Sequence, residues 1–223
     1  MPSSIPVVQY SQIRGSLMSG DVITFVGKSR DPIDWAIKMV EGQPYTHAGL
    51  VIRDGSNLYY WDAPGGGTQF PDPYRNNKLH DGCRVADLDA LLKYYMAEEV
   101  AMYLRRIQPV LSAGQNAALR IFIEAADGLP FPGENVKLPM RLNLGVGLGL
   151  SCAIGNEFKA TIAGSFYCAH LAAESYMRMG LLPIAPYPAN SYTPANFDSD
   201  DPAKLPLVAP ATLTSLVEVH FDI

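Results

Sequence analysis

The sequence is short of charge and contains no long uninterrupted hydrophobic run. Charged residues make up 17% of the 223 positions, and the formal net charge is −5. General binders of nucleic acid or of anionic membranes are normally basic, so these partners are not expected. The longest apolar run, residues 144–154, is rich in glycine and about half as long as a membrane-spanning helix. We therefore expect no integral membrane segment.

Cysteine is also scarce. The three cysteines are Cys83, Cys152 and Cys168, and none lies in a CxxC pattern, which argues against a zinc or redox motif. No phosphate-binding loop and no ligand cluster is apparent, so we expect no metal and no organic cofactor. Unpaired thiols suit a reducing compartment, and the first residues lack the basic start and apolar core of a signal peptide. A soluble protein made in the cytoplasm is expected, with its final site of action left open.

Proline and glycine, by contrast, are frequent, with 18 and 19 copies that indicate many loops. The length suits a single domain over residues 1–223. Hydrophobic spacing predicts helices over 33–40, 88–98, 112–127 and 167–179, and strands over 22–26, 45–53, 58–62, 99–107 and 215–221. These elements do not follow a regular βαβ order. The predicted class is therefore α+β, with a small antiparallel sheet or barrel packed on helices.

Two of the predicted strands form a hairpin whose loop is 54–57. Counting back from that loop sets Arg53 opposite Leu58 and Gly49 opposite Asp62. His47 then lies on the same face as Asp62, one diagonal step away, at a backbone separation of roughly 7–8 Å. A carboxylate there would fix the imidazole tautomer and stabilise an imidazolium. The alternative is a surface histidine beside a strand-end aspartate, and an odd-length loop would separate the two residues.

Cys168 falls in the first turn of the predicted helix 167–179, with Ser165 as a cap and Gly180 as the terminating residue. A helix N-terminus and a nearby imidazolium both stabilise a thiolate, and free N–H groups of the first turn can bind an oxyanion. A buried structural cysteine is the alternative reading, and it suits Cys83 and Cys152 better. His170 is too close in sequence to face the sulfur from the same helix.

Several short motifs, in this order, resemble a known family. They are Gly20-Asp21-Val22-Ile23, then residues 44–52 around His47, then Tyr60-Trp61-Asp62-Ala63, and finally Phe166-Tyr167-Cys168 followed by residues 191–197. This pattern resembles the circularly permuted papain-like enzymes of the NlpC/P60 superfamily. The resemblance implies a papain-like fold with Cys168 as nucleophile, His47 as base and Asp62 as the third polar member. Relatives often carry Glu at that third position.

The predicted chemistry is acyl transfer through a thioester acyl-enzyme. Cys168 attacks a carbonyl, His47 moves the proton and Asp62 holds His47. Tyr45, two residues before His47, is a candidate oxyanion or substrate-orienting group. The resemblance suggests amide, peptide or acyl-lipid substrates, so the first hypothesis is a cysteine amidase or peptidase. The alternatives are a lipid-directed thioesterase or acyltransferase, and a catalytically silent ligand-binding scaffold. Residues 142–154 form either a lid or acyl-chain wall or an ordinary core segment.

Overall fold

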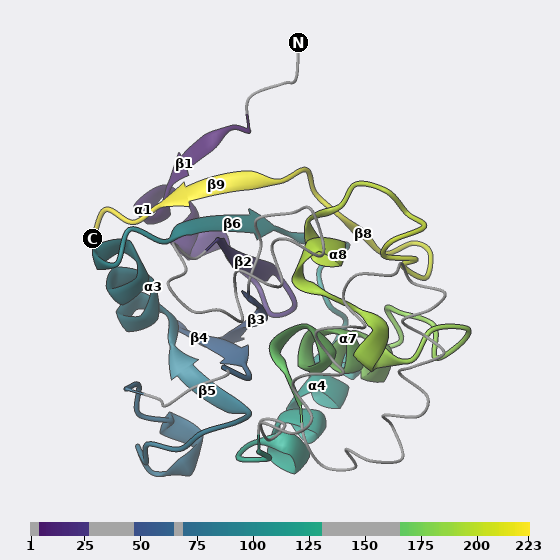
Figure 1. The fold of residues 1–223 in the computed structure, drawn as a ribbon, viewed down its shortest axis with the longest axis horizontal. Coiled ribbons are helices and arrows are strands. Elements are labelled where there is room, and N and C mark those ends of the chain that lie inside the picture. Colours follow the sequence, from purple (N-terminus) through teal and green to yellow (C-terminus); the bar gives the residue numbers. More distant parts are fainter. Residues whose placement is uncertain (1–4, 27–46, 65–68, 131–165) are drawn as a thin grey trace.

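A computed structural model describes residues 5–26, 47–64, 69–130 and 166–223. Its main feature is a seven-stranded mixed sheet in the order β1-β9-β6-β2-β3-β4-β5, which crosses the centre of Figure 1. β1 runs parallel to β9, and the other neighbouring strands are antiparallel. The strands are β1 (Val7–Gln9), β2 (Val22–Val26), β3 (His47–Asp54), β4 (Asn57–Asp62), β5 (Arg84–Asp87), β6 (Ala101–Arg105) and β9 (Val217–His220).

Helices and short elements complete the fold. The α-helices are α1 (Tyr10–Ile13), α3 (Leu88–Ala97), α4 (Ala113–Ala126), α7 (Cys168–Arg178) and α8 (Pro194–Asp198). Three short 3₁₀ turns are η1 (Arg14–Ser16), η2 (Pro73–Arg75) and η3 (Ala189–Ser191). A second, two-stranded sheet pairs β7 (Ile107–Gln108) with β8 (Thr212–Leu213).

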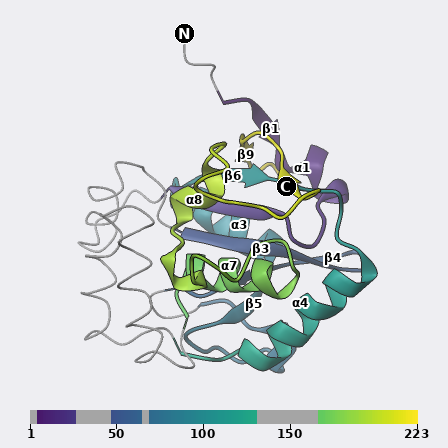
Figure 2. The ribbon, with the colours of Figure 1, turned by 90° about the vertical axis from the view of Figure 1, so that its right-hand side faces the viewer.

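Helices cover both faces of the main sheet because its strands alternate between two apolar cores. In β2, Val22 faces a core formed with α4, α7 and α8, whereas Ile23 and Phe25 face a core formed with α1 and α3. The views in Figures 1 and 2 show α7 and α4 on one side of the strands and α3 on the other. A strand buried on both faces in this way holds its side chains in fixed positions.

The α+β class is confirmed, and so are most of the predicted elements. The helices expected over 88–98, 112–127 and 167–179 correspond to α3, α4 and α7. α4 begins with a capping box in which the Ser112 side chain and Gln115 each bind the other's backbone N–H. The expected helix 33–40 and the apolar segment 142–154 lie outside the described residues.

The predicted barrel is not found in the part of the chain that the structure describes. β1 and β5 form the two edges of an open sheet, and they do not pair with each other. The prediction also missed β1, because three residues at the start of a chain carry too little alternation to be recognised. Within these same ranges, no helix is long and apolar enough to cross a bilayer.

Candidate functional site

The β3–β4 hairpin brings His47 and Asp62 together. Val51 pairs with Tyr60 and Arg53 with Leu58, as the sequence predicts, and continuing this register sets Gly49 beside Asp62. The turn itself is shorter than predicted, because Asp54 and Asn57 still pair and only two residues connect the strands. His47 Nε2 lies 2.9 Å from Asp62 Oδ2, so the two side chains share a hydrogen bond.

Asp62 is fully buried and is held by a second partner that the sequence analysis missed. Arg84 occupies the position directly opposite Asp62 on β5. Its Nε donates to Asp62 Oδ1 over 3.0 Å, and its guanidinium lies 5.4 Å from the centre of the Phe70 ring. Burial by itself would raise the pKa of Asp62, but Arg84 and the hydrogen bond to His47 outweigh it and lower that pKa. Asp62 is therefore an anion that faces the imidazole.

His47 sits among charged and aromatic neighbours with only 15% of its side chain exposed. Burial opposes its positive charge, but Cys168 and Asp62 outweigh burial and raise the pKa of His47 to about 10. The side chain of Cys168 lies close enough to His47 to act on its charge. The imidazole thus lies between the cysteine and the aspartate, and it is protonated at neutral pH.

Cys168 is the first residue of α7, which follows a β-conformation at Tyr167. The predicted capping residue Ser165 lies outside the described residues, and the N-cap position is that of Tyr167. The Tyr167 hydroxyl donates to the backbone carbonyl of Asn190, which ties the start of α7 to η3. At the other end, Gly180 has φ +70°, as expected of a terminating glycine. Cys168 itself is half-buried.

An aromatic wall borders the same site on the side of α3. The Phe25 ring packs at a tilt against Tyr95 with ring centres 4.5 Å apart, and it lies 6.0 Å from the His47 ring. The Tyr60 ring is 6.2 Å from His47, and its hydroxyl donates to the Ile23 carbonyl. Burial, followed by the charge of Asp62, raises the pKa of Tyr95, so its hydroxyl is neutral. These rings keep water from the buried side of the imidazole, which strengthens its contact with Asp62.

The remaining sequence candidates are separated from this site or outside the described residues. Tyr45 and Cys152 fall outside them. Cys83 is fully buried, as expected of a structural cysteine, and burial raises the pKa of its thiol. His170 packs on Phe166 and Tyr167, with ring centres 4.6 Å and 5.4 Å away. His220 pairs with Glu218 on β9.

A second group of ligand-type side chains, which the sequence analysis did not expect, lies near β5. One ligand atom each from Asp72, His80 and Asp127 lies within 4.8 Å of the others. The three residues come from the loop before η2, the loop before β5 and the end of α4. Their wide separation in the sequence explains why no spacing motif revealed them. These are the described residues that could hold a metal ion.

The comparisons with known proteins do not supply a family. No family model matches the chain, and no curated protein matches it. Among solved structures, the chain is similar to the metalloprotein YiiX from Escherichia coli O157:H7, described as DUF1105, with 15% identity and a TM-score of 0.46. The match covers 73% of this chain, and the chain spans 66% of the length of that protein. The predicted membership of the NlpC/P60 superfamily is contradicted by this finding, and a papain-like fold is not confirmed.

Proposed function

We propose that the protein is a cysteine hydrolase that cleaves amide or peptide bonds, with Cys168 as nucleophile, His47 as proton carrier and Asp62 as the residue that orients His47. The observation that carries the proposal is that His47 contacts both partners, with Asp62 Oδ2 2.9 Å from Nε2 and Cys168 as its other side-chain partner. A nucleophile, a base and an anion that orients the base are the elements that acyl transfer requires.

The charges of the resting site support this assignment. The protonated His47 places a positive charge beside Cys168, where the attack on a carbonyl needs a compensated negative charge on sulfur. The first turn of α7 adds backbone N–H groups whose hydrogen-bonding capacity is not used within the helix. These N–H groups are the candidate donors for the oxyanion that forms when Cys168 attacks.

The reaction proceeds in two steps under this proposal. The Cys168 sulfur forms a bond to the carbonyl carbon, and the C–N bond breaks as His47 gives its proton to the leaving amine. Water then attacks the thioester while His47 accepts a proton from that water, and the carboxylic acid leaves with Cys168 and His47 restored. Asp62, held by Arg84, keeps the imidazole in one orientation throughout.

Alkylation with iodoacetamide, followed by mapping of the labelled peptides, tests the site. Near neutral pH, Cys168 should be alkylated about 10-fold faster in the wild type than in His47→Ala, and the buried Cys83 should react slowly in both proteins. His220→Ala serves as the matched control, because this histidine contacts Glu218 on the far strand β9 and should leave the rate unchanged. Equal, slow labelling of all three cysteines would disprove the catalytic assignment.

A pair of probes then tests the substrate class. Peptides with an electrophilic amide analogue should label Cys168 faster than long-chain acyl thioesters do. The opposite order would replace the amidase proposal with a lipid-directed thioesterase or acyltransferase that uses the same three residues. Labelling by neither probe, together with fast alkylation, would leave a reactive cysteine and exclude both substrate classes.

A further inference from the structure

The Asp72–His80–Asp127 cluster has the spacing of a cation site. His80 Nε2 lies 2.9 Å from Asp72 Oδ2 and 3.8 Å from Asp127 Oδ1. Nitrogen and oxygen ligands about 2.0–2.2 Å from a divalent ion are separated from each other by roughly 3.0–3.5 Å, depending on the coordination geometry. The two observed separations fall on either side of that range. Small side-chain movements would therefore bring all three atoms to one ion.

A second observation that points to a cation is a buried carboxylate oxygen of Asp127 without a hydrogen-bond donor among the described residues. The Asp127 side chain is 7% exposed, and Arg75 Nε donates to its Oδ2 over 2.9 Å. Its other oxygen, Oδ1, is buried and meets no hydrogen-bond donor from the described part of the chain. That oxygen belongs to a carboxyl group whose neighbour is the Asp72 carboxylate, another acceptor. Two acceptors that face each other away from water need a proton or a cation between them.

The ligands are also oriented as metal ligands are. His80 Nδ1 lies 3.2 Å from the Asp81 carbonyl oxygen, which only accepts, so Nδ1 carries a proton there and Nε2 points at the two carboxylates. Histidines that bind metals commonly donate their other N–H to a backbone carbonyl in this way. Asp72 is fixed by the N–H groups of Tyr74 and Val85, at 2.8 Å and 2.9 Å.

We propose that Asp72, His80 and Asp127 form a binding site for a divalent first-row transition cation such as Zn²⁺. One imidazole nitrogen and two carboxylate oxygens form a donor set that suits such ions, whereas Mg²⁺ and Ca²⁺ prefer oxygen alone. Asp127 follows the last turn of α4, where the helix dipole favours a cation over an isolated carboxylate. His80 keeps 19% of its side chain exposed, which leaves a route from solvent.

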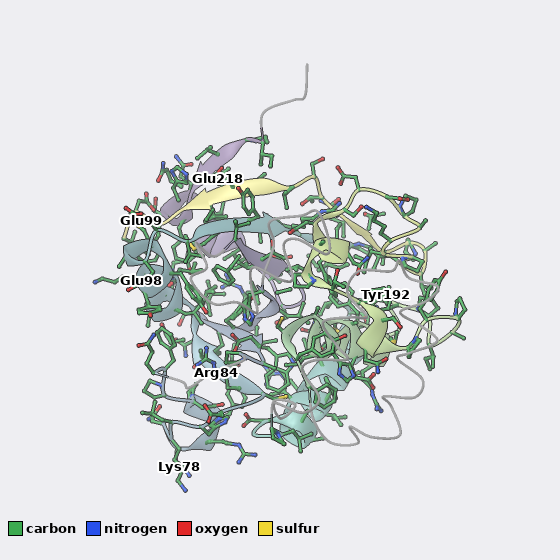
Figure 3. All side chains as sticks on the ribbon, in the orientation of Figure 1. Lys78, Arg84, Glu98, Glu99, Tyr192 and Glu218 are labelled. Atoms are coloured by element: carbon green, nitrogen blue, oxygen red, sulfur yellow. The ribbon has the colours of Figure 1, made fainter. Side chains whose placement is uncertain are left out.

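The position of the site indicates a structural role next to the candidate active site. The cation would join the loop that carries η2, the start of β5 and the end of α4. The Asp72 carboxylate accepts from the backbone of Val85, the residue after Arg84, and Arg84 binds Asp62. Arg84, at the start of β5, is buried, whereas Lys78 from the loop between η2 and β5 lies at the rim of the view in Figure 3. The metal would therefore hold β5, and with it Arg84, in place without contacting Cys168.

Zinc titration of the metal-stripped full-length protein tests the site. Isothermal titration should give one equivalent of bound Zn²⁺, tighter than Mg²⁺ or Ca²⁺, and bound zinc should raise the thermal midpoint. His80→Gln and the isosteric Asp127→Asn should each weaken zinc binding by about 10–100-fold. His220→Gln is the control and should bind as the wild type does, because His220 pairs with Glu218 on β9, which is separated from β5 by four strands of the sheet.

Two further measurements separate this site from the cysteine. Cys168→Ala should still bind one equivalent of zinc, and X-ray absorption of the zinc-loaded wild type should show nitrogen and oxygen ligands without sulfur. Loss of binding in Cys168→Ala, or sulfur in the first coordination sphere, would place the metal elsewhere and overturn the proposal. If the protein binds no stoichiometric zinc, a proton and not a metal ion lies between the two carboxylates, and the proposal is overturned as well. None of these results depends on hydrolytic activity.

Discussion

Arg84 and Asp62 face each other across β5 and β4 with both side chains buried, and Arg84 Nε donates to Asp62 Oδ1 over 3.0 Å. The other carboxylate oxygen of Asp62 binds His47. The candidate site is therefore a chain of four residues, from arginine through aspartate and histidine to cysteine. In this series of four residues, Arg84 acts through the Asp62 carboxylate that it fixes.

Arg84→Met should destabilise the protein by about 3–5 kcal/mol, because it takes the charge and the hydrogen bond of Arg84 away from a fully buried carboxylate and leaves His47 to compensate that charge. Arg120→Met is the matched control. Arg120 also pairs with an aspartate, Asp54, but both side chains are more than half exposed, so its loss should cost at most about 1 kcal/mol. Urea unfolding of both variants near neutral pH provides the comparison. A similar loss of unfolding free energy in the two variants would mean that Arg84 does not stabilise the buried charge of Asp62.

The raised pKa of His47 should appear in an NMR titration of its imidazole. The wild type should titrate near pH 10, and Cys168→Ala should move the pKa back toward the ordinary value of about 6.5 because it removes the strongest of the charges that raise that pKa. A native pKa above the unfolded value stabilises the protein below about pH 6.5, and this contribution is lost as pH rises through about 10. The stability difference between wild type and His47→Gln should accordingly shrink over that range. An unchanged pKa in Cys168→Ala would disprove the contact between the two side chains.

Gly49→Ala should be destabilising because the added methyl group has no space. A Cβ at this position would lie 2.5 Å from Cζ of Tyr60 and 2.6 Å from the Trp61 carbonyl oxygen. Tyr60 is held by its hydrogen bond to Ile23 and cannot move away freely. We expect a loss of about 1–3 kcal/mol in urea unfolding. Gly114→Ala in α4 meets nothing within 4 Å and should be neutral or slightly stabilising, and an equal loss in both variants would contradict the argument.

Asp198 should make the protein less stable as pH rises. Burial raises the pKa of this carboxyl to about 7, with the hydrogen bond from Thr24 and the charge of Arg105 opposing burial. The native state then holds a proton that the unfolded state releases above about pH 4, so stability falls between pH 4 and 7. Asp198→Asn should reduce the loss between pH 5 and 8 by about 2–3 kcal/mol, as measured by urea unfolding. Asp54→Asn, at an exposed position, should leave the loss unchanged. If Asp198→Asn and Asp54→Asn both lose stability with pH as steeply as the wild type does, Asp198 is not the group that causes the loss.

The sequence by itself determined the α+β class, the hairpin register and the start of α7. Each of these depends on local information. Alternation with period two fixes which residues of β3 and β4 share a face, so His47 and Asp62 could be paired from the chain alone. Helical spacing that begins at Cys168 and ends at Gly180 likewise needs no distant partner.

Tertiary structure alone decided the order of the seven strands, the role of Arg84 and the meeting of Asp72, His80 and Asp127. A lone arginine in the short segment Arg84–Asp87 gives no sign of its partner, although an arginine in a β-prone run is itself a reason to look for a buried carboxylate. The family assignment also failed, because the short motifs that suggested it describe local geometry. Contacts between residues far apart in sequence depend on which elements pack together, and that is set by the whole core.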